Sequence, residues 1–201
     1  MSLTAYHHFA KAPVPGAPLV FAFHGTGGDE HQFTDLVQEI LPKSGIIAPR
    51  GDVLEHGSNR FFRRTGEGVY DMDDLAARTE KMIGFIRAHK AEYEGLPVYG
   101  LGYSNGANIL ASVVLNAPHL FDRIVLMHPL IPWRPEPNPG LRRLEMLITA
   151  GRRDPICPLP VTQAFIDFLK SQGADLQLIL HDGGHEVRPE ELVAINTFLN
   201  S

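Results

Sequence analysis

The sequence predicts an α/β fold, in which a mostly parallel central sheet of about six to seven strands is flanked by helices. Apolar runs of strand length alternate with segments of helical periodicity along all 201 residues, which is typical of such sheets. With 44% hydrophobic residues the chain can bury one good core, so we expect residues 1–201 to form a single domain. Two irregular stretches, residues 49–70 and 129–140, are too short for a separate cap domain, so a shallow site without a roof is expected.

Six apolar runs have the length and composition of buried strands. They span residues 19–23, 45–48, 97–101, 123–127, 145–149 and 176–180. A further strand at the edge of the sheet is predicted for residues 4–9.

Helices are predicted where apolar residues recur three or four positions apart. The segments are residues 71–90, 107–115 and 161–171, and a last helix that begins at Pro189, since proline is favoured in a first turn. The last helix is expected to bury Leu192, Ile195, Phe198 and Leu199.

Residues 102–106, Gly-Tyr-Ser-Asn-Gly, have the form G-x-S-x-G between a predicted strand and a predicted helix. At such a corner the serine stands on a strained backbone that presents its Oγ to substrate. Glycines on both sides prevent crowding in the sharp turn. Because five-residue patterns match by chance, an ordinary strand–turn–helix explains this run alone equally well.

The residues that would activate Ser104 follow later in the chain. A serine hydroxyl needs a base, and the base needs a carboxylate that orients it. In folds with this serine corner the order is Ser, then Asp or Glu, then His. Asp154 follows the strand at 145–149 and His185 follows the strand at 176–180. Both therefore come just after the carboxyl end of a strand, where open α/β sheets gather their active sites, and we predict the triad Ser104, Asp154 and His185.

Other residues are alternatives for these roles. His181 is still close to its strand and could face the sheet surface, so His185 on its glycine-rich turn is preferred as the base. Asp182 is interpreted as a turn residue. His24 and His128 follow other predicted strands and are interpreted as hydrogen-bonded structural histidines.

Hydrolysis of an ester also needs donors for the tetrahedral oxyanion. One is the backbone N–H of the residue after the nucleophile, Asn105. The second is expected in the glycine-containing loop 24–28, where we assign the N–H of Thr26. A phosphate-binding loop is excluded, because the run lacks the third glycine of G-x-G-x-x-G and no Gly-Lys-Ser/Thr follows.

The two irregular stretches are expected to line the substrate pocket. The candidate lining residues are Phe61, Phe62, Arg63, Leu130 and Trp133. Ordinary packing would explain the apolar members equally well. The arginines at 60, 63 and 64 either bind an acidic substrate or pair with Glu67, Asp71 or Asp73.

Neither a metal nor a cofactor is expected. The acidic groups at 29–30 and 71–74 precede predicted helices, where carboxylates cap free N–H groups, so capping is preferred to metal binding. The single cysteine, Cys157, excludes an intrachain disulfide and a cysteine-rich zinc site, and is interpreted as a small buried residue.

The overall composition excludes several classes of partner. A net charge of −5 argues against nucleic acid, whose phosphates require a basic surface. No apolar run approaches membrane-spanning length, and residues 1–9 lack the layout of a signal peptide. We therefore expect a cytoplasmic protein that does not insert into membranes.

Three segments together carry a family resemblance. Residues 24–30, 50–54 and 102–106 resemble the bacterial phospholipase/carboxylesterase family of α/β-hydrolases, to which acyl-protein thioesterases also belong. Residues 60–71 resemble a bacterial branch linked to quinone-stress operons. The resemblance implies the α/β-hydrolase fold, no metal, an open groove and often a homodimer. It implies the same triad and the same oxyanion donors, whereas dienelactone hydrolases carry a cysteine where this chain has Ser104.

The sequence thus predicts a serine carboxylesterase that hydrolyses small carboxylic esters or thioesters through an acyl-enzyme. Two alternatives stay open. One is a catalytically silent ligand-binding protein on a hydrolase scaffold. The other is an amidase or peptidase that uses the same triad.

Overall fold

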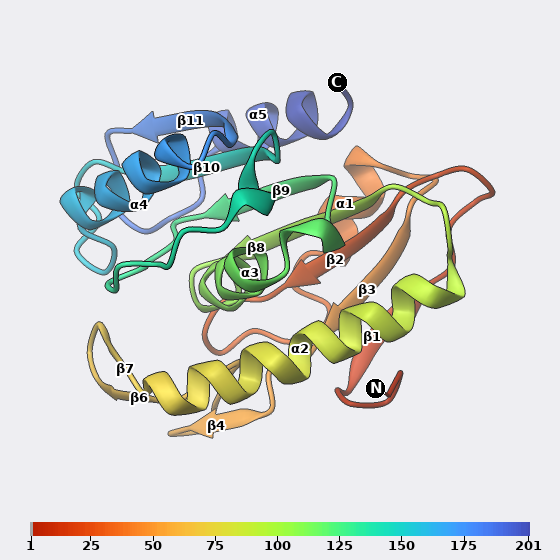
Figure 1. The fold of residues 1–201 in the computed structure, drawn as a ribbon, viewed down its shortest axis with the longest axis horizontal. Coiled ribbons are helices and arrows are strands. Elements are labelled where there is room, and N and C mark those ends of the chain that lie inside the picture. The colour runs from red at the N-terminus through yellow and green to blue at the C-terminus, as the bar shows by residue number, and fades with distance from the viewer. Residues whose placement is uncertain (1) are drawn as a thin grey trace.

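The computed structural model describes residues 2–201, and a seven-stranded sheet with helices on both faces runs through it (Figure 1). The strands are β1 (His8–Lys11), β2 (Leu19–Phe23), β3 (Gly45–Pro49), β8 (Val98–Tyr103), β9 (Arg123–Met127), β10 (Glu145–Gly151) and β11 (Asp175–His181). Their spatial order is β1-β3-β2-β8-β9-β10-β11. Every neighbouring pair is parallel except β1 with β3. The predicted mostly parallel sheet is confirmed, and the six strands other than β1 differ from their predictions only at their ends.

The edge strand β1 begins later than the predicted span of residues 4–9. Ahead of it, the N–H of Ala5 closes a turn onto the carbonyl of Ser2 at 3.2 Å. Tyr6 is buried edge-on against Phe85, with ring centres 5.3 Å apart. Packing of this tyrosine, rather than strand pairing, therefore fixes the first residues.

Within residues 2–201, five α-helices cover the sheet. They are α1 (Thr34–Ile40), α2 (Met72–Glu92), α3 (Asn105–Asn116), α4 (Leu159–Ser171) and α5 (Pro189–Leu199), with short 3₁₀ turns at Pro118–Leu120 and Pro139–Leu141. Helices α2, α3 and α4 share one core with the sheet, which includes Phe21, Ile86 and Leu110. Helices α1 and α5 lie on the opposite face. Within residues 2–201 no helix covers the carboxyl ends of the strands, which confirms the expected lack of a cap.

The two acidic groups behave differently at helix starts. Asp71 caps α2 and accepts the N–H of Asp74 at 3.0 Å, as predicted. Asp29 and Glu30 do not open a helix, because a turn separates them from the start of α1 at Thr34. Glu30 instead pairs with Arg50, whose Nη2 donates to Oε1 of Glu30 at 2.6 Å.

One prediction for α5, the burial of Leu192, is wrong. Ile195, Phe198 and Leu199 are buried as expected, but Leu192 is 36% exposed. It lies in a shallow groove between α5 and α1, which Leu36 and Ile40 of α1 also line without closing it.

The irregular stretch 49–70 forms two small antiparallel hairpins. The first pairs β4 (Val53–Glu55) with β5 (Ser58–Arg60), and the second pairs β6 (Arg64–Gly66) with β7 (Val69–Tyr70). Both follow β3, so they lie near the carboxyl ends of the central strands (Figure 1). None of the helices in residues 2–201 combines the length and apolar character that crossing a membrane requires.

Candidate active site

Ser104 lies at the corner between β8 and α3. Its backbone has a φ of 51°, which non-glycine residues adopt only when the surroundings enforce it. Two backbone hydrogen bonds do so: Ser104 N–H donates to the carbonyl of Met127 at 2.9 Å, and Asn108 N–H donates to that of Ser104 at 2.9 Å. Gly106 lets the corner approach the end of β2, since a Cβ there would lie 2.3 Å from the carbonyl oxygen of Phe23.

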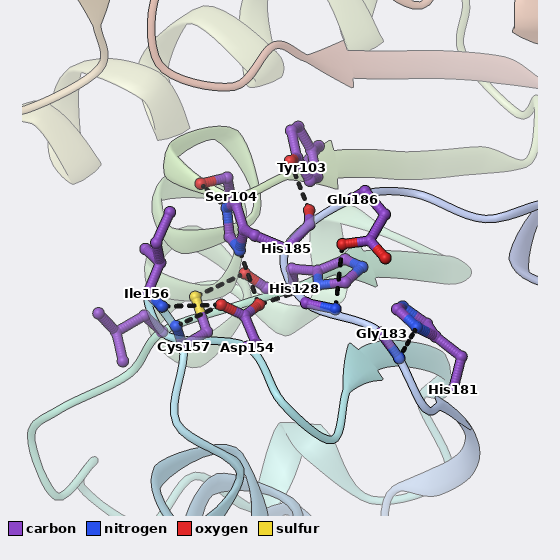
Figure 2. Close-up of polar contacts among 12 residues, drawn as sticks. Tyr103, Ser104, His128, Asp154, Ile156, Cys157, His181, Gly183, His185 and Glu186 are labelled. Carbon is purple, nitrogen blue, oxygen red and sulfur yellow. Dashed lines mark hydrogen bonds and ion pairs between the residues drawn. The ribbon is translucent and has the colours of Figure 1, made fainter.

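His185 and Asp154 reach Ser104 from the loops after β11 and β10 (Figure 2). Nε2 of His185 lies 2.8 Å from Oγ of Ser104, and its Nδ1 lies 2.7 Å from Oδ2 of Asp154. The side chain of Asp154 is fully buried, whereas that of His185 is partly exposed. His181 is buried and its Nδ1 accepts the N–H of Gly183 at 3.0 Å, so it does not reach the serine. The structure thus brings together the three residues that the sequence selected.

Four donors surround the carboxylate of Asp154. Its Oδ1 accepts the backbone N–H groups of Ile156 at 2.8 Å and Cys157 at 2.9 Å. Its Oδ2 faces His185 and also Nδ1 of His128, at 3.1 Å. Burial alone would raise the pKa of Asp154, but the hydrogen bonds, with that from Cys157 the largest, outweigh it and lower this pKa. Asp154 is therefore held ionised and in one orientation.

His128 connects Asp154 to a second buried carboxylate. Its Nε2 lies 2.9 Å from Oε1 of Glu191, and all three side chains are fully buried. Ionised carboxylates only accept hydrogen bonds, so both ring nitrogens of His128 must donate, as in an imidazolium. Burial opposes that charge, but the hydrogen bonds and charges of Glu191 and Asp154 outweigh it and raise the pKa of His128.

The sequence pattern did not predict this connection. His128 was expected to be hydrogen-bonded, which the structure confirms, but its contact with Asp154 was not anticipated. The available signal was its place directly after β9, at the same edge of the sheet as Asp154. The burial of Glu191 was harder to predict from the sequence, because an acidic residue in the first turn of a helix is usually exposed.

His181, His128 and Glu191 also have the composition of a metal site, since one ligand atom from each lies within 4.8 Å of the others. Nδ1 of His181 accepts the N–H of Gly183, so its Nε2 carries the proton and faces Oε2 of Glu191 at 3.3 Å. A metal would need the unprotonated nitrogens of both histidines. The contacts therefore fit a proton-bearing network better than a metal site.

The proposed oxyanion donors, Thr26 and Asn105, line the cavity next to Ser104. Within residues 2–201, the N–H of Thr26 makes no hydrogen bond. Asn105 is the first residue of α3, so its N–H has no helical acceptor. The Thr26 loop is fixed on both sides, because Gly25 N–H donates to Oε1 of Gln32 at 2.8 Å and Gly27 N–H donates to the carbonyl of Asn59 at 2.9 Å.

Ser104 opens into a cavity of about 350 Å³. The lining residues are Thr26, Arg60, Arg64, Glu67, Gly68, Tyr70, Tyr103, Ser104, Asn105, Asn108, Leu130, Ile156, Cys157 and His185. Leu130 is thus placed in the wall of this cavity, and its contact with substrate stays a prediction. Cys157 is buried as predicted, and burial raises the pKa of its thiol, which disfavours a thiolate.

Four predicted pocket residues lie elsewhere. Phe61 and Phe62 are fully buried under the hairpins, where Phe61 packs near His24 and Phe62 contacts Tyr70 edge-on. Arg63 is turned away from the cavity and pairs with Asp71 at 3.2 Å. Trp133 lines a separate groove beside α4. The predictions for these four residues are wrong. Residues 61–63 connect the two hairpins and Trp133 lies in the loop after β9, so no strand or helix periodicity indicates where these side chains point.

The structure places two further candidates, His24 and Asp182, away from Ser104. His24 is hydrogen-bonded, as predicted: its Nε2 accepts the N–H of Gly51 at 2.9 Å, and its Nδ1 donates to the carbonyl of Gly25 at 2.7 Å. Burial lowers its pKa, so it is neutral. Asp182 lies at the surface, 3.3 Å from Arg152, and does not reach the site.

Comparison with known proteins agrees with this architecture. The family model described as serine aminopeptidase, S33, matches residues 17–145. The Bacillus subtilis (strain 168) protein named "Putative hydrolase MhqD" is 36% identical over 175 residues, which cover 86% of this chain and 88% of that protein.

Two solved structures are similar over nearly their whole length. Atu2452, a protein of unknown function from Agrobacterium tumefaciens str. C58, is 53% identical with a TM-score of 0.92, and the match covers 100% of this chain and 98% of that one. A carboxylesterase from Bacillus cereus is 30% identical with a TM-score of 0.90, over 97% of this chain and 93% of that one. These matches, together with the parallel sheet and the serine corner, show that the chain belongs to the phospholipase/carboxylesterase-like α/β-hydrolases.

Proposed function

We propose that this protein is a serine carboxylesterase that hydrolyses small carboxylic esters or thioesters through an acyl-enzyme. The observation that carries the proposal is the unbroken series of contacts from Ser104 through His185 to Asp154, at 2.8 and 2.7 Å, beside an open cavity. Reactive serines need such a base and such an orienting carboxylate.

In the proposed reaction, Oγ of Ser104 attacks the ester carbonyl while Nε2 of His185 accepts its proton. The N–H groups of Thr26 and Asn105 donate to the oxyanion, and Asp154 stabilises the imidazolium. Collapse of the tetrahedral intermediate breaks the bond to the alcohol, which takes the proton from His185. Water then attacks the acyl-enzyme by the same route and releases the acid. Proton transfer of this kind contributes on the order of 10²- to 10⁴-fold, and one oxyanion donor about 10²- to 10³-fold.

The cavity favours short substrates. Its volume of about 350 Å³ lies at the low end of the range for small-molecule sites. Leu130 and Ile156 offer apolar contact for a short chain, whereas a long acyl chain would extend into solvent.

The test is hydrolysis of p-nitrophenyl esters from acetate to decanoate by the wild type and by Ser104→Ala. We expect turnover with short esters, loss of activity in Ser104→Ala, and labelling of the wild type alone by a fluorophosphonate probe. Ser171→Ala, which changes an exposed serine at the end of α4, is the matched control and should retain activity. Comparable kcat/KM on the matching p-nitroanilides would indicate an amidase, and absence of both turnover and labelling would indicate a ligand-binding protein.

A further inference from the structure

Arg60 is a nearly buried cation in the wall of the cavity that contains Ser104. Its side chain is only 5% exposed, yet it lines the cavity together with Thr26 and Ser104. Its Nη1 donates to Oγ1 of Thr26 at 2.8 Å, so the guanidinium lies directly beside the proposed oxyanion loop. Its Nε lies 3.2 Å from Oε2 of Glu55. Within residues 2–201, Nη2 makes no hydrogen bond, so this arginine has unused donors.

A second arginine shares the same counter-ion. Nε of Arg64 lies 2.9 Å from Oε1 of Glu55, and Arg64 also lines the cavity. Two guanidinium groups thus face one carboxylate on this wall. Because two guanidinium groups share this one carboxylate, their positive charge is only partly compensated by it. Burial, and then the charge of Arg64, lower the pKa of Arg60. An anion bound beside Arg60 would balance the remaining positive charge of the two guanidinium groups.

We propose that Arg60, assisted by Arg64, binds a carboxylate of the substrate, so that the preferred substrates are monoesters of short dicarboxylic acids. The guanidinium fork matches a carboxylate, and its place beside Thr26 sets the substrate carboxylate on the acyl side, a few bonds from the reacting carbonyl. Leu130 and Ile156 line the same cavity and offer apolar contact to the rest of the substrate. This inference rests on the proposed esterase function and adds the substrate class.

One acidic residue opposes this preference. Glu67 lines the cavity on the turn of the second hairpin and is exposed, so its charge is partly screened by solvent. It makes no salt bridge within residues 2–201. Glu67 therefore weakens the attraction for an anion, and its removal should strengthen the preference.

The experiment compares monoethyl glutarate with ethyl valerate, which has a methyl group in place of the carboxylate. Hydrolysis is followed by acid release, and the measured quantity is the ratio of the two kcat/KM values. We expect a ratio of about ten or more for the wild type, since hydrogen bonds to charged groups are worth about 1.5–3 kcal/mol, or about 10- to 150-fold. Because the ratio compares two esters in one variant, a partial loss of folded protein cancels.

The variants test each charge separately. Arg60→Gln should lower the ratio to near one, and Arg64→Gln should lower it about two- to fivefold, because its side chain is more exposed. Glu67→Gln should raise the ratio. Arg63→Gln removes the same charge from the neighbouring residue outside the cavity and is the matched control, with an unchanged ratio. If Arg60→Gln lowers kcat/KM equally for both esters, Arg60 acts on the oxyanion loop and not on a substrate carboxylate, and the proposal is overturned.

A binding measurement separates this inference from the proposed function. Titration calorimetry of glutarate into the wild type and Arg60→Gln should show binding that depends on Arg60 and is absent for the uncharged amide valeramide. Glutarate binding without any ester turnover would contradict the esterase function and leave the carboxylate site standing. Turnover of both esters with a ratio near one, and no glutarate binding, would overturn the carboxylate site and leave the esterase function standing.

Discussion

Nδ1 of His128 lies 3.1 Å from Oδ2 of Asp154, the same oxygen that His185 contacts at 2.7 Å. Two histidines from different strand ends therefore share one carboxylate oxygen, and both must donate to it. Because the backbone N–H groups of Ile156 and Cys157 occupy the other oxygen, the carboxylate accepts four hydrogen bonds. Asp154 can neither rotate nor accept a proton without losing at least one of them.

Asp154→Asn is expected to be far more damaging than the loss of one charge. An asparagine amide has one accepting oxygen, so in either orientation its NH₂ group would face two donors. We expect kcat to fall on the order of 10⁴-fold, as in serine hydrolases that lose the orienting carboxylate. The free energy of unfolding should also fall by about 1–3 kcal/mol because buried donors lose their acceptor.

Ester turnover and urea unfolding of Asp154→Asn measure these two effects. Asp182→Asn, a surface carboxylate on the neighbouring loop, is the control and should change neither quantity. Near-normal kcat in Asp154→Asn would contradict the role of Asp154 in the proposed mechanism.

The stability provided by His128 should depend on pH with a definite sign. Its pKa in the folded state is raised above the ordinary value of about 6.5. Its stabilising contribution is therefore fully present below about pH 6.5 and is lost as the pH rises through the folded value. We expect His128→Gln to lower the free energy of unfolding by about 3–5 kcal/mol in mild acid, and by less at alkaline pH.

His89→Gln provides a control of opposite sign. His89 is also buried, but desolvation lowers its pKa, with the nearby His8 adding to the effect. Its contribution is present above the unfolded pKa and is lost as the pH falls. Urea unfolding of both variants and the wild type between pH 5 and about 9 covers the ordinary histidine value. A cost of His128→Gln that does not shrink at alkaline pH would contradict the imidazolium assignment.

The triad positions could be predicted because topology alone constrains them. In a parallel sheet all carboxyl ends meet at one edge, so residues after β8, β10 and β11 approach one another whatever the helices between them do. Ser104, Asp154 and His185 follow those strands, and the distances agree. Their catalytic roles stay a proposal that the ester assays test.

The part of the cavity wall that the two hairpins form could not be predicted, because it is built from strands of two or three residues. Such strands show no readable alternation, so nothing in the sequence separated Arg60 and Arg64, which line the cavity, from Arg63, which does not. Phe61 and Phe62 illustrate the same limit, since an apolar pair fits a core and a pocket equally well. Glu191 was missed because its burial depends on His128, a partner far away in the chain.

Tyr103→Phe should impair the positioning of His185. The hydroxyl of Tyr103 donates to the backbone carbonyl of His185 at 2.7 Å, and the two rings lie 5.3 Å apart (Figure 2). Burial, with the charge of Asp154 adding to it, raises the pKa of Tyr103 to about 12, so the hydroxyl keeps its proton and remains a donor. Loss of this bond should lower kcat by up to about tenfold, because one hydrogen bond is worth about 0.5–1.5 kcal/mol.

Tyr99→Phe removes a hydroxyl from the same strand without touching the His185 loop, and should leave kcat unchanged. Steady-state kinetics with a short p-nitrophenyl ester separate kcat from KM. An effect of Tyr103→Phe on KM alone would indicate that the tyrosine contacts substrate instead of positioning His185.

Gly106→Ala tests whether the serine corner requires close approach of the backbone. A Cβ at this position would lie 2.3 Å from the carbonyl oxygen of Phe23 and 2.4 Å from that of His24, and neither can move without shifting the end of β2. We expect the free energy of unfolding to fall by about 3 kcal/mol or more, at the upper end for an overpacked site. Any folded fraction should also lose activity, because the displaced strand end carries the Thr26 loop.

Gly66→Ala, where the nearest atom is 3.8 Å away, is the matched control and should retain both stability and activity. Thermal unfolding of the two variants therefore distinguishes a steric requirement at residue 106 from a general intolerance of alanine, and equal melting temperatures would show that the corner can relax around the added methyl group.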